Sequence, residues 1–336
     1  MSLIISYIIV RFEQISFIMN SKLIFFALSL LIISCKNKED STKGTSSRYN
    51  DALQYITVLG IAQDGGYPHI NNTNEFEAVT SGSIKKELVV SLGIIDKEAK
   101  KKFLIEATPD LPEQLAILDA HFLDQDPIIN GVFLTHAHIG HYTGLMYFGR
   151  EAMGAKDINV FAMPKMKSFL ESNGPWSQLV TLDNIRIQAL KDREPLKVTN
   201  EINVTPFTVP HRDEFSETVG YKISGPTKTA LFIPDINKWS LWENNIVDEV
   251  KKVDYAFLDA TFYKDGEIPR PMSEVPHPFI QETIELFNNE VEEIKSKIIF
   301  IHFNHSNLLI NPENKDRKKL EEEGYRFANT GDVFGL

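Results

Sequence analysis

Three histidines lie within six residues of one another, at a point where a strand pattern gives way to a helical one. They are His136, His138 and His141 in the segment VFLTHAHIGHYTGL. Side chains two residues apart at the end of a strand can face one pocket, and the following turn brings the third beside them. Imidazole nitrogen is a natural ligand for zinc or iron. A lone buried histidine is usually a core residue, but this spacing favours a metal site.

Three later strand patterns also end in a residue that can bind a metal. His211, Asp235 and His302 each come directly after a short apolar run. Any one of them alone could be a helix cap or an ordinary loop residue. Functional groups collect where strands end and loops begin, so the recurrence favours a shared site. Asp235 could also act as general base for a metal-bound water.

The composition limits both the metal ligands and the partners. The chain has 336 residues, which is long enough to bury a full core, and its formal net charge is −11. Because an acidic surface repels phosphate backbones, we expect no nucleic-acid partner. Cys35 is the one cysteine, so a metal site in the folded part must be built from His, Asp and Glu.

The N-terminal segment has the pattern of an export signal. From Met19 the chain reads MNSKLIFFALSLLIISC, with a lysine before an apolar run that ends at Cys35. This run resembles a bacterial lipobox and is short for a transmembrane helix, which needs ~20 apolar residues. We expect a signal peptide over residues 1–34, with Met19 as the true start, a lipidated Cys35, and a flexible tether over residues 35–50. The protein would then be exported and anchored to a bacterial membrane, at the periplasmic face or the cell surface; an uncleaved signal anchor is the alternative.

From residue 51 to 336 the pattern predicts a single α/β domain. Many short apolar runs alternate with fewer amphipathic stretches, without a long linker or internal repeat. Strands are expected at 55–61, 88–95, 103–107, 131–135, 158–162, 185–190, 204–209, 219–224, 229–233, 255–258 and 297–302. Helices are expected at 112–121, 143–153, 164–171, 237–251 and 278–289.

These residues resemble the motifs of the metallo-β-lactamase superfamily. His136, His138 and His141 are similar to its His-x-His-x-Asp-His motif, and the three later residues follow in the family's order. The resemblance implies an αββα four-layer sandwich in which His136, His138, His141, His211, Asp235 and His302 bind metal. Glu106 stands where that family has a supporting aspartate.

Within the superfamily the chain resembles the pyrroloquinoline quinone biosynthesis protein B group. The similar segments are residues 58–68, 106–111 and 302–307, although that group's cysteines after the first segment are absent. The resemblance, with the pattern around each residue, implies supporting or substrate-contacting roles. We expect these for Glu106, Asp64, His277, Asn304 and His305. The turn Asp64-Gly65-Gly66 is either a tight turn or a loop over the metal pocket.

One motif position departs from the family. Gly140 stands where the superfamily has an aspartate that binds the second metal, and glycine has no side chain to do so. A second ion should therefore bind more weakly. Three alternatives remain: a mononuclear enzyme, a dinuclear site with His277 or His305 in place of the lost ligand, and a degenerate site without turnover.

These alternatives lead to three functional hypotheses. The first is a metal-dependent hydrolase of an ester, lactone, amide or phosphodiester, acting on a small molecule. The second is a metal-dependent oxidoreductase or hydroxylase, and the third is a non-catalytic lipoprotein that binds a metal or ligand. One or two zinc ions are expected, with Fe²⁺ or Mn²⁺ as alternatives. The sequence predicts neither the substrate nor the oligomeric state.

Overall fold

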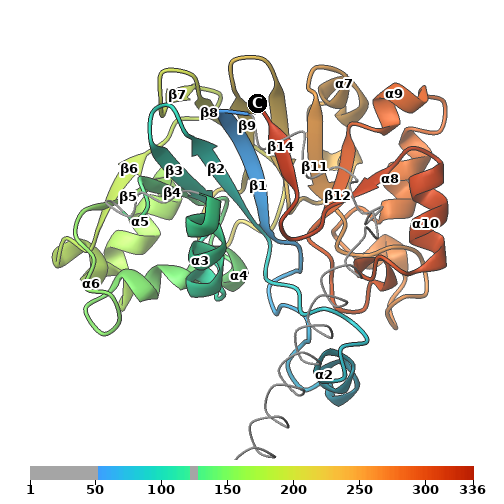
Figure 1. Cartoon of the computed structure of the whole chain (residues 1–336), viewed down its shortest axis with the longest axis horizontal. Helices are drawn as coiled ribbons and strands as arrows, with labels where there is room; N and C mark the ends of the chain where they lie inside the picture. The colour runs from blue at the N-terminus through green and yellow to red at the C-terminus, as the bar shows by residue number, and fades with distance from the viewer. Residues whose placement is uncertain (1–51, 122–127) are drawn as a thin grey trace, which may run out of the picture. The chain divides into compact units, whose positions relative to one another are not determined.

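The computed structural model describes residues 52–121 and 128–336, so the predicted signal peptide, Cys35 and the tether lie outside the described residues. Two seven-stranded sheets form the centre of the domain (Figure 1). The first has the order β14 (Val333–Gly335), β1 (Gln54–Gly60), β2 (Ser91–Asp96), β3 (Lys101–Ile105), β4 (Gly131–Phe133), β5 (Ile158–Ala162) and β6 (Ile185–Ala189). The second has the order β13 (Arg326–Phe327), β12 (Ile298–Ile301), β11 (Tyr255–Asp259), β10 (Thr229–Ile233), β9 (Val219–Ser224), β8 (Asn203–Thr208) and β7 (Leu196–Lys197).

Helices flank the two sheets on their outer sides (Figure 1). Beside the first sheet are α3 (Leu111–His121), α4 (Ile139–Tyr142), the 3₁₀ helix η1 (Thr143–Phe148), α5 (Pro164–Ser172) and α6 (Trp176–Thr181). Beside the second are α7 (Ile246–Lys251), α8 (Ile280–Leu286), α9 (Glu292–Lys295) and α10 (Lys315–Glu322). The short turns η2 (Trp239–Leu241), η3 (Met272–Glu274) and η4 (Leu308–Ile310) connect elements of this half. These layers are those of the expected αββα sandwich.

The alternation of side chains along the strands fills two separate cores. In β4, Phe133 belongs to the core between the sheets, whereas Val132 belongs to the core under the helices of the first sheet. Neighbouring side chains of a strand point to opposite faces, so one strand supplies both cores. The strand that precedes His136 therefore packs against apolar side chains on both of its faces.

Strand directions bring the predicted ligands to one edge of the sandwich. β1, β3 and β4 run parallel to one another, as do β8, β10, β11 and β12. Ala62, just after β1, bridges to Phe303, just after β12, which joins the two sheets at this edge. The opposite edge holds the start of β1, where Leu336 donates its backbone N–H to the carbonyl of Gln54.

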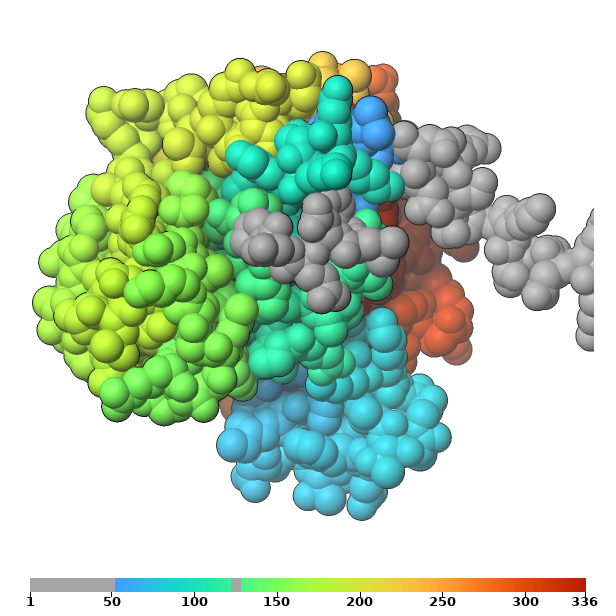
Figure 2. Space-filling view, turned by 60° about the vertical axis from the view of Figure 1, so that its left-hand side comes forward, coloured from blue at the N-terminus to red at the C-terminus, as the bar shows by residue number. Residues whose placement is uncertain are grey.

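Helix α2 (Thr73–Thr80) was not expected and lies at the edge where β1 ends (Figure 1). In Figure 2 the segment that carries it, coloured light blue, forms a lobe that protrudes from the domain. Asn72 caps the start of this helix, because its side chain accepts the backbone N–H of Glu75. This lobe belongs to the chain segment between β1 and β2.

Two predicted helices are shorter or of a different kind than expected. The expected helix 143–153 is instead η1, which follows α4. A Cβ at Gly144 would lie 2.0 Å from the carbonyl oxygen of Thr108, so this turn packs directly on backbone. The expected helix 237–251 is η2 followed by α7, because Asn245 caps α7 by accepting the N–H groups of Val247 and Asp248.

None of the described helices combines the length and the apolar composition that crossing a bilayer requires.

Candidate metal centre

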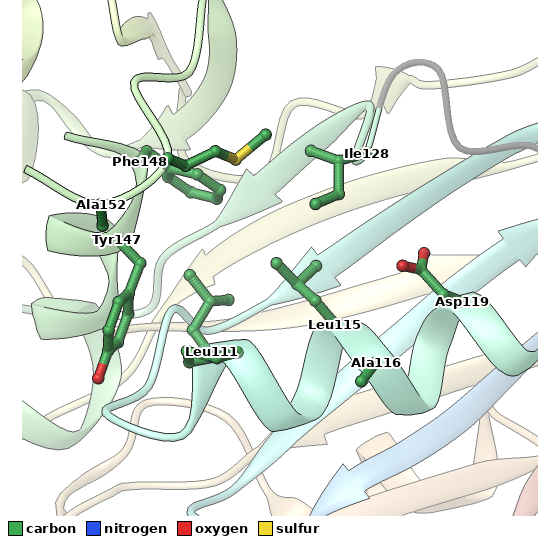
Figure 3. A pocket seen from close by; sticks show the side chains of 10 residues that line it. Leu111, Leu115, Ala116, Asp119, Ile128, Tyr147, Phe148 and Ala152 are labelled. Carbon is green, nitrogen blue, oxygen red and sulfur yellow. The ribbon is translucent and has the colours of Figure 1, made fainter. Parts of the chain in front are cut away.

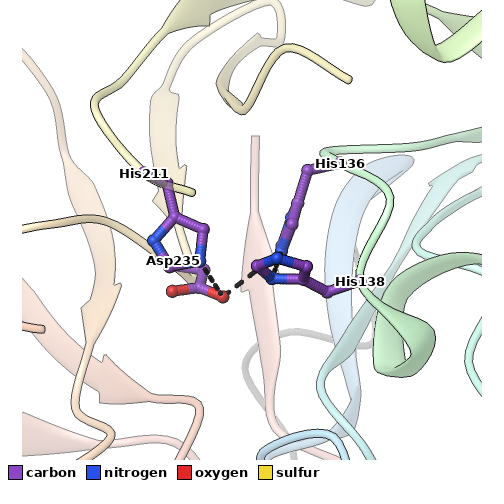
Figure 4. A group of neighbouring side chains, drawn as sticks. All are labelled: His136, His138, His211 and Asp235. Atoms are coloured by element: carbon purple, nitrogen blue, oxygen red, sulfur yellow. Dashed lines mark hydrogen bonds and ion pairs between the residues drawn. The ribbon is translucent and has the colours of Figure 1, made fainter. Parts of the chain in front are cut away.

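Four side chains from three parts of the chain meet between the ends of the two sheets. His136 and His138 follow β4, His211 follows β8, and Asp235 follows β10. Figure 4 shows His211 on one side and His136 with His138 on the other, with the Asp235 carboxylate between them. His136 Nε2 lies 2.8 Å from His138 Nδ1 and 3.3 Å from Asp235 Oδ2, and His211 Nε2 lies 3.2 Å from the same oxygen. We call these four residues group 1.

A second group lies beside the first and includes a residue that was not expected to bind metal. His141 and His302 are fully buried, and Asp64 places its Oδ1 3.2 Å from His141 Nε2. The candidate ligand atoms of Asp64, His141 and His302 all lie within 4.8 Å of one another. We call these three residues group 2. Asp235 Oδ2 lies 3.9 Å from His141 Nε2, so its carboxylate stands between the two groups.

Three ring nitrogens and two carboxylate oxygens at the groups lack hydrogen-bond partners among the described residues, which is the state expected of metal ligands. Within the described residues, the buried atoms without a partner include His141 Nε2, His211 Nε2, His302 Nε2, Asp64 Oδ1 and Asp235 Oδ1. Leaving a buried polar atom unsatisfied costs about 1–3 kcal/mol. Four of them, the three ring nitrogens and Asp64 Oδ1, line the two groups, where divalent cations would satisfy them, whereas Asp235 Oδ1 faces His277. The donor set is therefore suited to a divalent metal.

The outward-facing nitrogen of each histidine has a partner of its own, which fixes the orientation of the ring. These partners are Thr135 for His136 (2.9 Å), Glu214 for His138 (3.4 Å), Glu106 for His141 (3.2 Å), Asn237 for His211 (3.3 Å) and Thr261 for His302 (2.9 Å). Of these partners, Glu106 was named from the sequence. The sequence analysis missed the other four.

Backbone strain accompanies two of these positions. Glu106 has φ 78° and His302 has φ 71°, a region that residues other than glycine rarely adopt. Both residues come directly after a strand, and both are fully buried. Non-glycine residues in such conformations cluster at functional sites because the surrounding structure must hold them there. In this backbone conformation the Glu106 side chain contacts His141 and the His302 ring contacts Thr261.

The charges of the site favour the forms that bind metal at group 1. Burial lowers the pKa of His136 well below its ordinary value, with the nearby His141 acting in the same direction. Burial alone would raise the pKa of Asp235, but His277 and His211 hold it well below its usual range. Neutral imidazole and ionised carboxylate are the forms required of ligands.

His277 and Asp259 form a further pair behind Asp235. His277 Nδ1 lies 2.9 Å from Asp259 Oδ2 and 3.2 Å from Asp235 Oδ1. Burial opposes a charge on this ring, but the two carboxylates raise the pKa of His277 to about 9. Asp259 also accepts the backbone N–H and the hydroxyl of Thr261, which in turn contacts His302. Sequence analysis overlooked Asp259, although it too directly follows an apolar run.

The structure places neither His277 nor His305 in the position of the missing motif aspartate. His277 contacts Asp235 and Asp259, and its ring centroid is 6.3 Å from that of His302. His305 stacks on His69 at 4.1 Å and lies 2.8 Å from a carboxylate oxygen of Glu75. Asp64 is the carboxylate that lies beside His141.

Asn304, also expected near the site, donates its side-chain amide to Gln63 Oε1 at 2.5 Å. This bond joins the loop after β12 to the residue before Asp64. Asn304 and His305 thus hold the rim of the site and belong to neither group.

An apolar groove of about 330 Å³ lies elsewhere, between α3 and the end of η1 with the segment that follows it (Figure 3). Leu111, Leu115 and Ala116 line one side, and Tyr147 and Phe148 line the other. No residue of either metal group lines it. The groove therefore adds nothing to the chemistry at the strand ends.

The sequence profile of the beta-lactamase superfamily domain matches residues 101–303. The chain belongs to this superfamily. The matched segment contains the whole of group 1 together with His141 and His302, whereas Asp64 lies outside it.

The chain is also similar to curated proteins named coenzyme PQQ synthesis protein B. It is 26% identical over 311 residues to the protein of Gluconobacter oxydans, covering 84% of this chain and 98% of that protein. Identity to the protein of Gluconacetobacter diazotrophicus is 24% over 314 residues, covering 82% and 97%. The group resemblance read from the sequence is therefore confirmed.

Solved structures agree with the fold. The crystal structure of Zn(2+)-bound PqqB from Methylobacterium extorquens superposes with a TM-score of 0.68 at 18% identity, covering 84% of this chain and all of that one. A diphosphatase from the PhnP family superposes with a TM-score of 0.55 at 21% identity, covering 84% and 96%. The predicted αββα sandwich is thus confirmed.

Proposed function

We propose that the protein is a metal-dependent hydrolase of a small ester, lactone, amide or phosphodiester. The observation that carries this proposal is group 1: three histidines and an aspartate converge, with outer partners on every ring. A divalent ion held there would act as a Lewis acid and lower the pKa of a bound water to about 7. We favour zinc because a zinc-bound relative shares the fold and because imidazole and carboxylate are common zinc ligands.

The residues of the chain would divide the remaining work. Asp235 Oδ2 faces His136 and His211, while Oδ1 faces His277, so this carboxylate can bind the ion and also exchange a proton. Asp259 holds the His277 ring from the other side. The proton on His277 Nδ1 can therefore be shared with Asp235 Oδ1 on one side and with Asp259 Oδ2 on the other. General acid–base catalysis of this kind contributes typically 10²–10⁴-fold to a rate.

The test combines metal content with a panel of chromogenic esters, lactones, anilides and phosphodiesters. We expect the zinc-loaded domain to hydrolyse one class, and His136→Ala to lose both that activity and an equivalent of zinc. His121→Gln, at the end of α3 and outside both groups, is the matched control and should keep both. Loaded protein that is inert across the panel, or activity that survives His136→Ala, would count against hydrolysis.

A metal-dependent oxidoreductase is the second candidate. It is favoured by the donor set, because both groups consist only of His and Asp, which suits iron as well as zinc. Similarity to the coenzyme PQQ synthesis proteins along most of the chain is compatible with it. Anaerobic purification should then give iron-bound protein that consumes oxygen with a phenolic substrate. Zinc alone, without redox activity, would exclude this candidate.

For the N-terminal segment we propose export and lipidation at Cys35, on the sequence pattern alone. Expression in a Gram-negative host with a radiolabelled fatty acid should label the full chain and not Cys35→Ala. Fractionation should place the labelled protein with membranes. Equal labelling of both proteins would overturn the proposal.

A further inference from the structure

We propose that Asp64 replaces the missing motif aspartate and, with His141 and His302, holds a second metal ion that Asp235 bridges to the first. The inference rests on the metal binding of the proposed function but not on hydrolysis. Asp64 comes from the turn after β1, a segment far in sequence from the histidine motif. The ligand lost at Gly140 has thus been supplied from elsewhere in the chain.

The first step is the lack of space at Gly140. A Cβ on this glycine would lie 2.2 Å from Asp64 Oδ1 and 2.6 Å from the Asp64 Cα. Contacts under about 3 Å are not compatible with an undisturbed backbone. Asp64 and an aspartate at position 140 therefore exclude one another. The absence of a side chain at Gly140 is what admits the Asp64 carboxylate.

The second step is the state of the atoms around that carboxylate. His141 and His302 are 0% exposed, and their Nε2 atoms have no hydrogen-bond partner among the described residues. Asp64 Oδ1 is likewise buried and without a hydrogen bond, although 31% of its side chain is exposed. The Nδ1 atoms of the two rings already have partners, Glu106 for His141 and Thr261 for His302. A cation among the three inner atoms would complete the group.

The third step is charge. The motif aspartate would have supplied one negative charge to this position, and Asp64 supplies the same. With Asp235 at 3.9 Å from His141 Nε2, a dication would meet two carboxylates and two imidazoles. That donor set matches the four-coordinate preference of zinc. The loss of the motif residue therefore does not imply a mononuclear or degenerate centre.

Two single variants test the inference by opposite means. Asp64→Asn removes the anionic ligand and keeps its shape, while Gly140→Ala keeps the ligand and removes its space. Zinc itself is the probe, measured as equivalents per chain by mass spectrometry after gel filtration and as affinity by competition with a chromogenic chelator. We expect two equivalents in the wild type. In each variant we expect at least tenfold weaker binding of the second ion, with the first unchanged.

The control is Asp110→Asn. This carboxylate packs near the same glycine turn and accepts the backbone N–H of Val89, but it belongs to neither metal group. It should keep two ions. Double substitution Asp64→Asn/Gly140→Ala should lose no more than either single variant, because both act on one ligand. Should Gly140→Ala fail to fold, Asp64→Asn alone decides the matter.

A second readout follows the turn itself. An ion held by Asp64 ties the turn after β1 to α4 and to the end of β12, so zinc should slow hydrogen exchange in residues 61–69. We expect that protection in the wild type and not in Asp64→Asn. Two ions of unchanged affinity in Asp64→Asn, or a single ion in the wild type, would overturn the inference and leave hydrolysis at group 1 possible. Conversely, two-ion protein without hydrolytic activity would overturn the function and leave the Asp64 ligand standing.

Discussion

The Tyr221 hydroxyl on β9 donates a hydrogen bond of 2.5 Å to the carbonyl oxygen of Leu134, which joins the two sheets two residues before His136. Val219, on the same strand, donates its backbone N–H to the carbonyl of Thr135 at 3.2 Å. Tyr221 is 0% exposed, and burial raises the pKa of its hydroxyl well above the usual value. The segment that leads into the histidine motif is thus fixed to the opposite sheet.

Removing this link should weaken the fold. Tyr221→Phe leaves the buried Leu134 carbonyl without its donor, and we expect a loss of about 1–3 kcal/mol in the free energy of unfolding. Urea denaturation of the apo-protein measures it. Tyr147→Phe is the control, because its ring lines the groove of Figure 3 and the described residues include no hydrogen-bond partner for its hydroxyl. Equal stability of the two variants would contradict the role given to Tyr221.

Glu106 should control metal affinity without touching the metal. Its Oε1 accepts the hydroxyl of Thr135 at 2.5 Å and lies 3.2 Å from His141 Nδ1. Loss of such an outer partner typically lowers metal affinity 10–100-fold, and we expect Glu106→Gln to do so for the second ion. Thr135→Ser keeps the hydroxyl and should bind both ions normally. Competition with a chelator measures the zinc affinity of both variants. Unchanged affinity for the second ion in Glu106→Gln would contradict the role of Glu106 in orienting His141.

Metal removal should lower thermal stability. Without a cation, Asp64 Oδ1 and the inner ring nitrogens of His141, His211 and His302 are buried atoms without a hydrogen-bond partner among the described residues. Treatment with EDTA should therefore lower Tm, and zinc should restore it in a concentration-dependent way. Free zinc at 100 times Kd should add about 2.7 kcal/mol to the free energy of unfolding. In the doubly substituted His136→Ala/His211→Ala protein, the response to zinc should be much smaller. A Tm that ignores both EDTA and zinc would contradict metal binding.

Glu87 provides a pH-dependent prediction away from the metal groups. Burial raises its pKa, only partly offset by the Thr330 hydroxyl and by Lys85. An acid with a raised pKa in the folded state binds its proton more tightly there than in the unfolded chain. Its ionisation therefore costs stability as pH rises through and above the unfolded value of about 4.3.

Glu87→Gln should consequently be more stable than the wild type at pH 7, and the difference should shrink as pH falls toward 4. Urea denaturation of both proteins at each pH measures the difference, which cancels changes at other groups. The amide oxygen can still accept the hydroxyl of Thr330, 2.8 Å from Glu87 Oε2 in the wild type. A difference that does not vary with pH would contradict the assignment.

The regular strands and group 1 were accessible from the sequence because each depends on local pattern. The strand expected at 219–224 is β9, and that at 229–233 is β10, since both alternate or run apolar between clear turns. The spacing of His136 and His138 in the sequence indicates a metal site. By contrast, β7 and β13 have two residues each and exist only through pairing with a neighbour, which leaves no periodic signal.

Asp64 could not be assigned a place in group 2 from the sequence. Its contact with His141 joins segments more than seventy residues apart, and nothing near Asp64 resembles a ligand motif. The glycine at position 140 read as a loss, because a sequence pattern shows the missing side chain and not the space it leaves. Only the approach of the Asp64 backbone to that glycine connects the two observations.

The meeting of Gln54 and Leu336 at the edge remote from the histidines has a practical consequence. The start of β1 and Leu336 both lie at the edge opposite the two metal groups. An affinity tag attached at Leu336 would begin at the edge remote from the imidazoles. Immobilised protein should therefore turn over soluble compounds as readily as protein free in solution.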